Sequence, residues 1–256
     1  NGTGKTQYLA NLAMDLSGIS RKKLRKNVFF PKRPLFRKVI AISYSIFDKF
    51  SRPKSDRSFS YTYCGLKDSN GRLMSNKKKG LKFSESIEKI KQKNLESQWL
   101  YVASIILENG PFKRLTNLFF GADLTNFNFE DLNDELSSGQ SFLIYVFTEV
   151  IANIKTNSLI LFDEPEMHLH PNATANLIRM FDYLLTTFES YALIATHSPI
   201  IIQEIPSRYV RVFNREGNTP LIYNLKLESF GENIEVLTQE VFQTKDVDDN
   251  YKKVSW

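Results

Sequence analysis

The sequence predicts an α/β fold in which a parallel or mixed sheet is flanked by helices, and three features support this prediction. Two apolar runs, SLILF and YALIA, each end in polar residues, and a helical pattern over about 173–187 separates them. Such strand–helix–strand alternation gives parallel strands joined by a crossover helix. The β-branched run at 39–45 adds a third strand. Ligands bind beyond the carboxyl ends of parallel strands, so the residues that follow SLILF and YALIA are the first candidates for a site.

The remaining elements are expected from local periodicity and turn signals. In the first half of the chain we expect a loop and helix over 1–18, a short strand within 59–64 and a helix over 84–109. The short strand lies inside a lysine-rich loop that has turn signals at SNGR and NKKKG. In the second half we expect a helix after the Gly turn at 139, a hairpin over 217–218 and a polar helix from 228.

The first six residues, NGTGKT, match the second half of a phosphate-binding loop of the form G-x-x-x-x-G-K-[ST]. We expect the first glycine of that loop, and the strand before it, to precede residue 1. In such a loop, Lys5 reaches the terminal phosphates and Thr6 places its hydroxyl on Mg²⁺. The alternative is an ordinary glycine-rich turn before a helix. The candidate nucleotide-binding residues of this segment are Asn1, Gly2, Thr3, Gly4, Lys5, Thr6 and Gln7.

Two further segments have the chemistry of a nucleotide site. Asp163 ends the apolar run SLILF, where a carboxylate can hold hydrated Mg²⁺, and Glu164 can polarise an attacking water. A strand that merely ends in a charged turn is the alternative. The segment LSSGQ at 136–140 opens an apolar helix, so its N–H groups and hydroxyls can face an anion. An ordinary serine cap would have the same sequence.

The composition is that of a globular protein from a reducing compartment. The 256 residues have a net charge of +6 and a pI near 9.2, which permits contact with nucleic acid without requiring it. The one cysteine, Cys64, excludes an internal disulfide and favours a cytoplasmic location. We find no apolar run of about 18 residues and no signal peptide, so no membrane partner is expected. One cysteine and few histidines also provide no usual ligand set for zinc.

Taken in order, GKT, LSSGQ, FDEPE and ATHSP resemble the motifs of the ABC superfamily of ATPases. LSSGQ is similar to the signature motif of that superfamily, and His197 is similar to its switch histidine. DEPE followed by HLHP resembles more closely the branch that contains RecF, SMC-like and OLD-like ATPases, because transporter subunits typically continue with Ser-Ala-Leu-Asp. The segments VIAISYSIFDKF and SFGENI look like those of ATPases from bacterial anti-phage systems of the Septu and retron-associated type.

This resemblance implies an ABC-type ATPase head whose two protomers face each other head to tail. ATP would lie between Lys5 of one protomer and the signature segment of the other. Thr6 and Asp163 would hold Mg²⁺, while Glu164 would activate water and His197 would contact the γ-phosphate. The signature residues implied are Ser137, Ser138, Gly139 and Gln140.

The resemblance also implies partners. They are a separately encoded HNH nuclease subunit and nucleic acid, either DNA or a retron RNA–DNA. Two other functions fit the same motifs: a nucleotide-gated scaffold with little turnover that restrains an effector, and a DNA repair ATPase of the RecF and SMC-like kind. A transporter motor is disfavoured by the residues after DEPE.

The motifs divide the chain into an N-terminal part of the ATPase core at 1–50, a small inserted helical lobe at 51–130 and a C-terminal part of the core at 131–256. The inserted lobe, roughly 50–130, holds no long heptad pattern, so no long coiled-coil arm is expected in these residues. The superfamily usually has a glutamine after the strand that follows the first helix. Here Ser45 or Asp48 is expected in its place.

Other polar segments are interpreted first as structural. His168 and His170 are expected to be turn residues rather than a metal pair. The acidic run at 246–249 is expected to be a solvated turn, so no nuclease site is predicted. The basic segment 20–37 is expected to be a solvated connection, with contact to a phosphate backbone as the alternative.

Overall fold

The computed structural model describes residues 4–17, 29–45, 49–50, 60–107, 109–121, 136–217 and 219–242. These residues form two compact units. The first unit is Lys5–Thr196, and the second consists of Asn1–Gly4 together with His197–Trp256. Each unit is described by itself. The division at 1–50, 51–130 and 131–256 that the motifs suggest concerns functional regions and stays a prediction.

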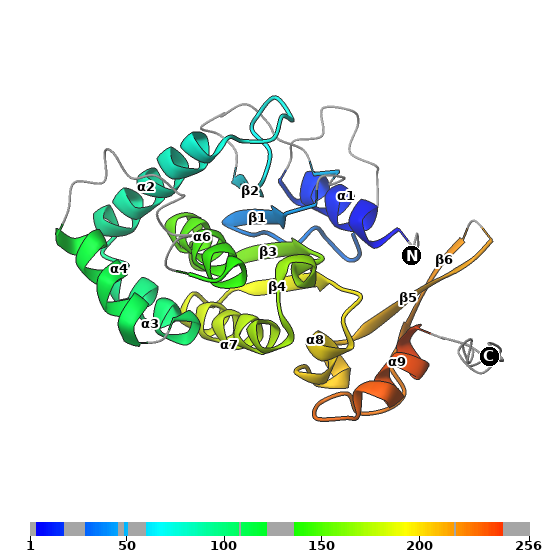
Figure 1. Ribbon diagram of the computed structural model, residues 1–256. Coiled ribbons are helices and arrows are strands. Elements are labelled where there is room, and N and C mark those ends of the chain that lie inside the picture. Colours follow the sequence, from blue (N-terminus) through cyan, green and yellow to red (C-terminus); the bar gives the residue numbers. More distant parts are fainter. Residues whose placement is uncertain are drawn as a thin grey trace, which may run out of the picture. The chain divides into compact units, whose positions relative to one another are not determined.

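The first unit is built on a four-stranded parallel sheet with the order β2-β1-β3-β4 (Figure 1). In register, Ser43 lies beside both Gly65 and Asp163, and Asp163 lies beside Ala195. The carboxyl ends of all four strands therefore meet at one edge, as the alternation of apolar runs predicts. The strands are β1 (Lys38–Ser43), β2 (Tyr61–Gly65), β3 (Ser158–Asp163) and β4 (Tyr191–Ala195).

Helices cover both faces of this sheet. Alternate strand residues such as Ala41 and Leu161 pack with the buried residues of α1 (Lys5–Ser17) on one face. On the other face, the ring of Phe162 contacts Phe181 of α7 (Pro171–Thr187). α6 (Ser138–Asn153) lies on that second face and is itself covered by α2 (Asn76–Gln92) and α3 (Glu96–Ile106), with α4 (Asn109–Gly121) outside α3 (Figure 1).

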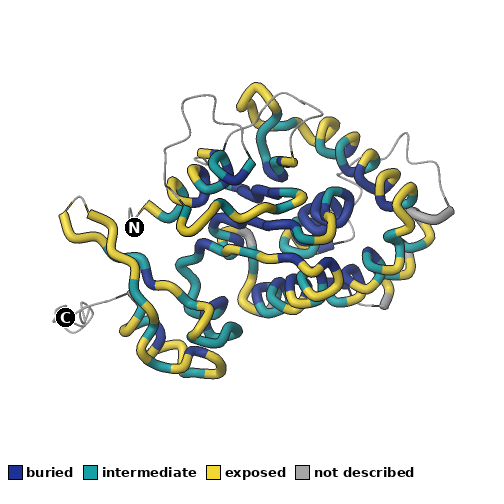
Figure 2. Tube along the Cα trace, turned by 180° about the vertical axis from the view of Figure 1, so that it is seen from behind, coloured by how far each residue is buried: buried dark blue, intermediate teal, exposed yellow. Residues whose placement is uncertain are grey.

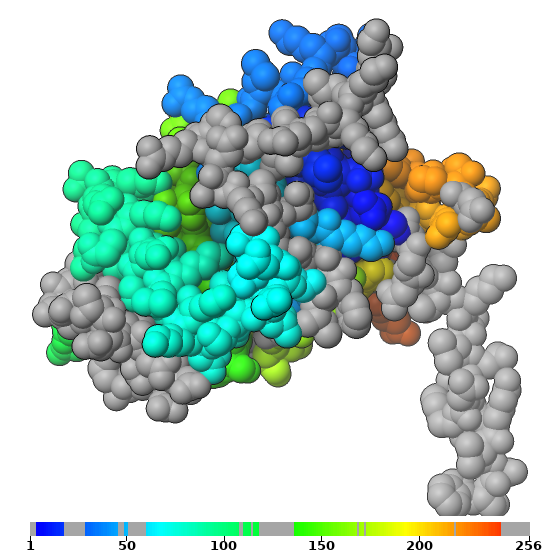
Figure 3. Space-filling view, turned by 90° about the horizontal axis from the view of Figure 1, so that it is seen from above, coloured from blue at the N-terminus to red at the C-terminus, as the bar shows by residue number. Residues whose placement is uncertain are grey.

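Burial follows these layers. Buried residues are concentrated in β1, β3 and α6, and α6 is accordingly apolar nearly all round (Figure 2). Seen from above, α1 and the segment from β2 into α2 form part of the surface of the first unit (Figure 3). The sheet, its parallel strands and the flanking helices confirm the α/β fold expected from the sequence. Within the described residues, none of the helices combines the length and apolar character that crossing a membrane requires.

The region 75–107 differs from its expected structure. One helix was predicted over 84–109, but α2 and α3 are separate helices, and Asn94 between them has a left-handed backbone with φ of 54°. The sequence NKKKG was expected to be a turn, yet it forms the start of α2. The reason is Ser75, whose hydroxyl accepts a hydrogen bond from the Lys78 N–H at 3.4 Å and so caps the helix.

The second unit contains the predicted hairpin. Its strands β5 (Arg211–Glu216) and β6 (Thr219–Asn224) are antiparallel. The polar helix expected after 228 is α9 (Ile234–Phe242), which packs on α8 (Pro199–Gln203) and buries Leu237. Gln203 fixes the turn before α9 by donating to the carbonyl of Glu232 at 2.6 Å. The acidic run at 246–249 lies outside the described residues.

Candidate functional site

The candidate site begins where α1 begins. Lys5 and Thr6 are the first two residues of this 13-residue helix. Gly4, directly before them, has a φ of +91°, a backbone conformation that favours glycine. Gln7 is exposed, and its side-chain amide donates to Asn11 one turn later at 3.0 Å. Residues 1–3 lie outside the described residues, so their role in a phosphate loop stays a prediction.

A hydrogen bond joins this helix to the end of β3. The Thr6 hydroxyl donates to Oδ1 of Asp163 at 3.0 Å. Asp163 is the last residue of β3 and is only 2% exposed. The two residues come from segments 157 positions apart in the chain. The contact therefore brings the GKT segment and the FDEPE segment, which the sequence assigned to one site, together at the carboxyl edge of the sheet.

Burial and three nearby carboxylates determine the pKa of Lys5. Burial lowers the pKa of the Lys5 ammonium, whereas the charges of Glu164, Glu166 and Asp163 act to raise it. Burial is the largest of these effects, so the pKa lies below the usual value for lysine. A partly buried ammonium beside several carboxylates is the charge arrangement expected where a phosphate and a metal cation are to be held together.

The turn after β3 is fixed to the end of β4. Glu164 has a left-handed backbone with φ of 48°, and its N–H donates to the carbonyl of Ala195 at 2.8 Å. The 3₁₀ turn η2 (Pro165–His168) then begins with proline. Oε1 of Glu166 accepts a hydrogen bond from the Thr196 hydroxyl at 2.8 Å. These contacts hold the Glu164 backbone in a conformation that non-glycine residues rarely adopt.

The LSSGQ segment forms the start of α6. Ser137 and Gln140 make a capping box, in which the Ser137 hydroxyl accepts from the Gln140 N–H at 3.3 Å and Oε1 of Gln140 accepts from the Ser137 N–H at 3.0 Å. The Gln140 amide also donates to the carbonyl of Ile106 at 3.3 Å, which ties this turn to the end of α3. Ser137 and Ser138 are exposed, and Gly139 is half-buried. The serine cap that was the alternative interpretation is therefore present, at an exposed helix N-terminus that also has the polarity to meet an anion.

His197 comes directly after Thr196, close in the chain to the end of β4. It belongs to the second compact unit, so its approach to a γ-phosphate stays a prediction. His168 ends η2, and His170 is the residue before α7, so both lie in the connection between β3 and α7. Among the described residues, no group of three or more His, Cys, Asp or Glu has the arrangement of a metal site.

The strand after α1 ends without a glutamine. Ser43, the last residue of β1, is buried and lies in register with Asp163. The Ser43 hydroxyl oxygen accepts a hydrogen bond from the Ser45 N–H at 3.4 Å. Ser45 is half-buried just beyond the strand, whereas Asp48 lies outside the described residues. Ser45 therefore stays a candidate for the place that a glutamine usually takes.

Comparison with known families matches this architecture. Residues 5–202 match the sequence model of a family described as the AAA ATPase domain. The chain belongs to this family. The match begins at Lys5 and runs past His197, so it includes α1, the signature segment and the end of β3. Membership in the AAA ATPase domain family confirms the expectation of a P-loop ATPase domain and supports the RecF and SMC-like branch.

Two further comparisons concern individual proteins. The chain is 28% identical over 284 residues to Protein ea59 of Escherichia phage lambda, an alignment that covers 94% of this chain and 52% of that protein. The chain thus spans about half the length of this relative. A solved structure of an ATP-binding cassette from an ABC transporter, in its ADP conformation, is 16% identical, covers 61% of this chain and 62% of that chain, and gives a TM-score of 0.29.

Three residues near the site were not singled out from the sequence. Glu166 acts on the Lys5 pKa, Thr196 binds Glu166, and Ser43 borders Asp163. A signal for Glu166 existed, because it is the second glutamate of the same FDEPE segment. Ser43 and Thr196 are small polar residues at strand ends. Only the sheet order of the AAA ATPase domain shows that they lie at the same edge as Asp163.

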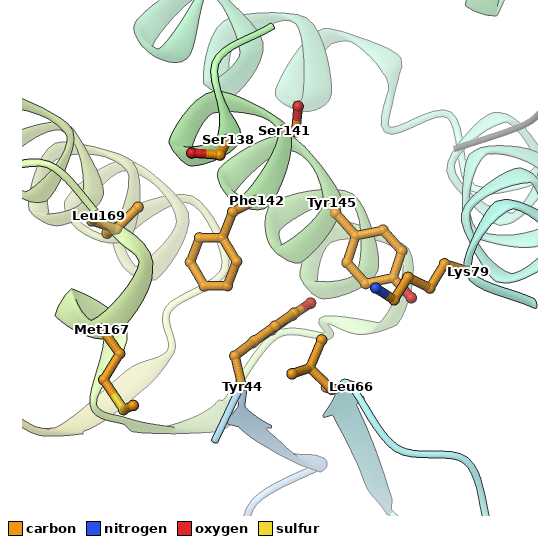
Figure 4. Close-up of a pocket in the computed structure, with 10 residues that line it drawn as sticks. Tyr44, Leu66, Lys79, Ser138, Ser141, Phe142, Tyr145, Met167 and Leu169 are labelled. Atoms are coloured by element: carbon orange, nitrogen blue, oxygen red, sulfur yellow. The ribbon is translucent and has the colours of Figure 1, made fainter. Parts of the chain in front are cut away.

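A cavity of about 490 Å³ lies beside this edge, between the start of α6 and the ends of β1 and β2. Figure 4 shows the rings of Tyr44, Phe142 and Tyr145 around it, with Met167 opposite. The Tyr44 and Phe142 rings meet edge to face with centroids 4.5 Å apart. Tyr44 follows Ser43 directly, so this aromatic packing connects the end of β1 with the first turns of α6.

Proposed function

We propose that this chain binds ATP with Mg²⁺ and hydrolyses ATP to ADP and phosphate. The observation that supports this most strongly is the 3.0 Å hydrogen bond from the Thr6 hydroxyl to the Asp163 carboxylate, with Lys5 beside it. Hydroxyl, carboxylate and ammonium are the three groups that a nucleotide phosphate and its metal ion require from the protein. Membership in a family of ATPase domains supports the same activity.

The donor set fits Mg²⁺. Thr6 and Asp163 supply two neighbouring oxygens, and Mg²⁺ in nucleotide sites typically takes one or two protein oxygens, with water and phosphate oxygens as its other ligands. A site without a dedicated cluster of three carboxylate or imidazole ligands is therefore the expected kind. When bound, the ion would neutralise charge on the phosphates.

The chain's own residues supply the remaining chemistry. Lys5 would bind the β- and γ-phosphates through its ammonium. Glu164 would accept a proton from the water whose oxygen forms the new bond to the γ-phosphorus, while the bond to the ADP oxygen breaks. The Glu164 backbone is anchored to the carbonyl of Ala195, which limits where its carboxylate can point. His197 would add a contact to the γ-phosphate.

The signature segment would act in a second protomer. Ser137 and Ser138 are exposed at the N-terminus of α6, so their hydroxyls and the helix dipole are accessible to the nucleotide of a facing copy. We infer a head-to-tail dimer with ATP between Lys5 of one copy and the Ser137–Gln140 segment of the other. Hydrolysis would then remove the ligand that holds the two copies together.

We place this cycle in an anti-phage defence complex directed at nucleic acid, with a separate HNH nuclease as partner. The support is the resemblance of the sequence motifs to the Septu and retron-associated ATPases. A DNA repair ATPase is the neighbouring possibility within the same branch. Co-purification of the full-length protein with its genomic neighbours tests the choice, because a nuclease subunit should remain bound in the defence complex and a repair ATPase should be recovered without it.

Phosphate release at saturating ATP tests the enzymatic activity. The Glu164→Gln variant should lose about 100-fold or more in rate, because the amide cannot accept the proton, while it still binds ATP. The matched control is Glu216→Gln, which replaces an exposed carboxylate at the end of β5 with an amide and should keep the wild-type rate.

Two results would contradict the proposal. A Glu164→Gln variant with wild-type turnover would exclude Glu164 as the base. A wild-type protein that binds ATP without measurable phosphate release would favour the nucleotide-gated scaffold, in which binding alone controls the partner.

A further inference from the structure

Four lysines gather at the amino edge of the sheet, opposite the carboxyl edge that holds Thr6 and Asp163. We call this group the lysine edge; its members are Lys38, Lys89, Lys93 and Lys155. Lys38 is the first residue of β1, and it lies in register with Ser158, the first residue of β3. Lys155 lies in the turn just before β3, where its N–H donates to the Ser158 hydroxyl oxygen at 3.0 Å.

The other two lysines reach the same edge from α2. Lys93 is the C-cap residue of α2, and its Nζ donates to the carbonyl of Ala152, in the last turn of α6, at 2.6 Å. Lys89 is one turn earlier on the same side of α2, because the N–H of Lys93 donates to its carbonyl at 3.1 Å. Three segments that are distant in sequence, namely the start of β1, the end of α2 and the turn before β3, therefore place lysines at one edge.

The charges at this edge repel one another. Burial lowers the pKa of Lys38, and the charges of Lys155, Lys93 and Lys89 lower it further. Burial likewise lowers the pKa of Lys93, with Lys155 and Lys89 as the other causes. Among the described residues, the main charges that act on these two pKa values are those of lysines, apart from Cys64, which acts to raise the pKa of Lys38. Like charges held together in this way would be stabilised by an anion that carries several negative charges.

Part of this arrangement has a structural purpose. α2 and α6 both end at this edge, and cations near the C-terminus of a helix stabilise it. Lys93 fulfils that role for α6 through its bond to the Ala152 carbonyl. Lys155 directly follows Ile154, the C-cap residue of α6, so its charge also lies near the end of that helix, in the exposed turn before β3. Arg37, exposed beside Lys38 and bonded through its N–H to the carbonyl of Asn157 at 2.9 Å, extends the basic surface further.

We propose that the lysine edge binds the phosphate backbone of double-stranded DNA. The exposed side chains of Lys89, Lys93 and Lys155 provide several separate positive charges, which suits a ligand with regularly repeated phosphates better than one with a single phosphate. The choice of DNA over another polyanion rests on the proposed function. Because the lysine edge and the Thr6–Asp163 pair lie at opposite ends of the strands, DNA and ATP would not compete for one site.

Anisotropy of a fluorescent 25-base-pair duplex, measured over a series of salt concentrations, tests this inference. In the full-length protein, the Lys89→Glu/Lys155→Glu variant should bind at least about tenfold more weakly. The slope of log K against log salt should fall by about 2, since each lost phosphate contact removes about 0.9. Lys93 is left intact because its removal would also uncap α6. Lys77→Glu/Lys113→Glu makes the same charge change at two other exposed positions and should retain most of the wild-type affinity.

Several outcomes would overturn the proposal. Equal losses in the two double variants would mean that only net charge matters. An unchanged affinity and salt slope in Lys89→Glu/Lys155→Glu would exclude the lysine edge as the DNA contact. Inorganic polyphosphate at equal phosphate concentration is a competitor for the same edge. If it displaced the duplex and bound much more tightly, the edge would be assigned to a free polyanion. The Lys89→Glu/Lys155→Glu variant should keep its basal phosphate release, so failure of this inference and failure of the ATPase proposal are distinguishable.

Discussion

At the scale of single residues, the charge of Lys5 depends on its surroundings. Its pKa is lowered by burial, and the nearby carboxylates offset only part of that effect. The ammonium form is therefore lost at a lower pH than in an exposed lysine. A bound phosphate would stabilise the charged form, so nucleotide binding and protonation of Lys5 favour each other.

We expect the affinity for a fluorescent ATP analogue to decrease as the pH rises from 7 toward 10, because the neutral amine cannot pair with phosphate. In the Lys5→Arg variant this decrease should disappear, since a guanidinium remains charged throughout that range. Fluorescence titration at each pH measures both proteins, with Lys113→Arg as a control at an exposed lysine. The same pH dependence in Lys5→Arg and in wild type would assign the decrease to another group.

The Thr6–Asp163 contact shows what sequence can and cannot predict about a site. The GKT and FDEPE motifs predicted that these two residues act together, and the structure brings them to hydrogen-bonding distance. The motifs could not show that Ser43 borders Asp163, because that contact depends on the pairing of β1 with β3. Nor could they decide the roles of residues 1–3, which lie outside the described residues, or of His197.

At the scale of elements, apolar patterning predicted the strands and helices around the site best. β3 was recognised as a continuous apolar run because all six of its residues are buried, β4 was recognised from its apolar composition, and α7 was recognised because its buried residues recur at helical spacing. α2 was placed too far along the chain because a lysine-rich first turn has no apolar pattern. The order of the strands, with β1 between β2 and β3, also had no local signal, since it is determined by packing of the whole unit.

The contact of α2 with α6 contains a buried ion pair. Lys82 Nζ lies 2.6 Å from Oε1 of Glu149, whose side chain is 1% exposed. Removing only one charge would leave the other buried without its partner. We therefore expect Lys82→Met to lower the free energy of unfolding by about 3–5 kcal/mol, and the double change Lys82→Met/Glu149→Leu to recover most of that loss.

Urea unfolding followed by circular dichroism measures these changes. The control is Lys91→Met, which removes the exposed Lys91–Glu88 pair on the same helix and should cost less than about 1 kcal/mol. If Lys82→Met were no more destabilising than Lys91→Met, the Lys82–Glu149 pair would not hold α2 on α6.

At the scale of the whole molecule, the proposed dimer depends on the exposed start of α6. A glutamate in place of Ser138 would interact favourably with the helix dipole, so α6 itself should stay folded. The same negative charge would repel the γ-phosphate held by a facing copy. Ser138→Glu should therefore prevent dimer formation without reducing stability.

Light scattering in the Glu164→Gln background, with and without ATP, measures this effect. Glu164→Gln alone should form an ATP-dependent dimer, and the added Ser138→Glu change should leave a monomer. Ser97→Glu, at an exposed position in the first turn of α3, is the matched control and should leave the dimer intact. A dimer that persists in the Ser138→Glu protein would exclude the start of α6 from the interface.

The position of β1 in the sheet has a consequence for synthesis on the ribosome. β1 pairs along its full length with β3, which is made more than a hundred residues after it. A nascent chain that has not reached residue 158 therefore exposes one edge of an apolar strand, the kind of surface on which chaperones act and growing chains aggregate. The Thr6 hydroxyl also meets its carboxylate partner only after β3 has emerged, because the two residues are 157 positions apart in the chain.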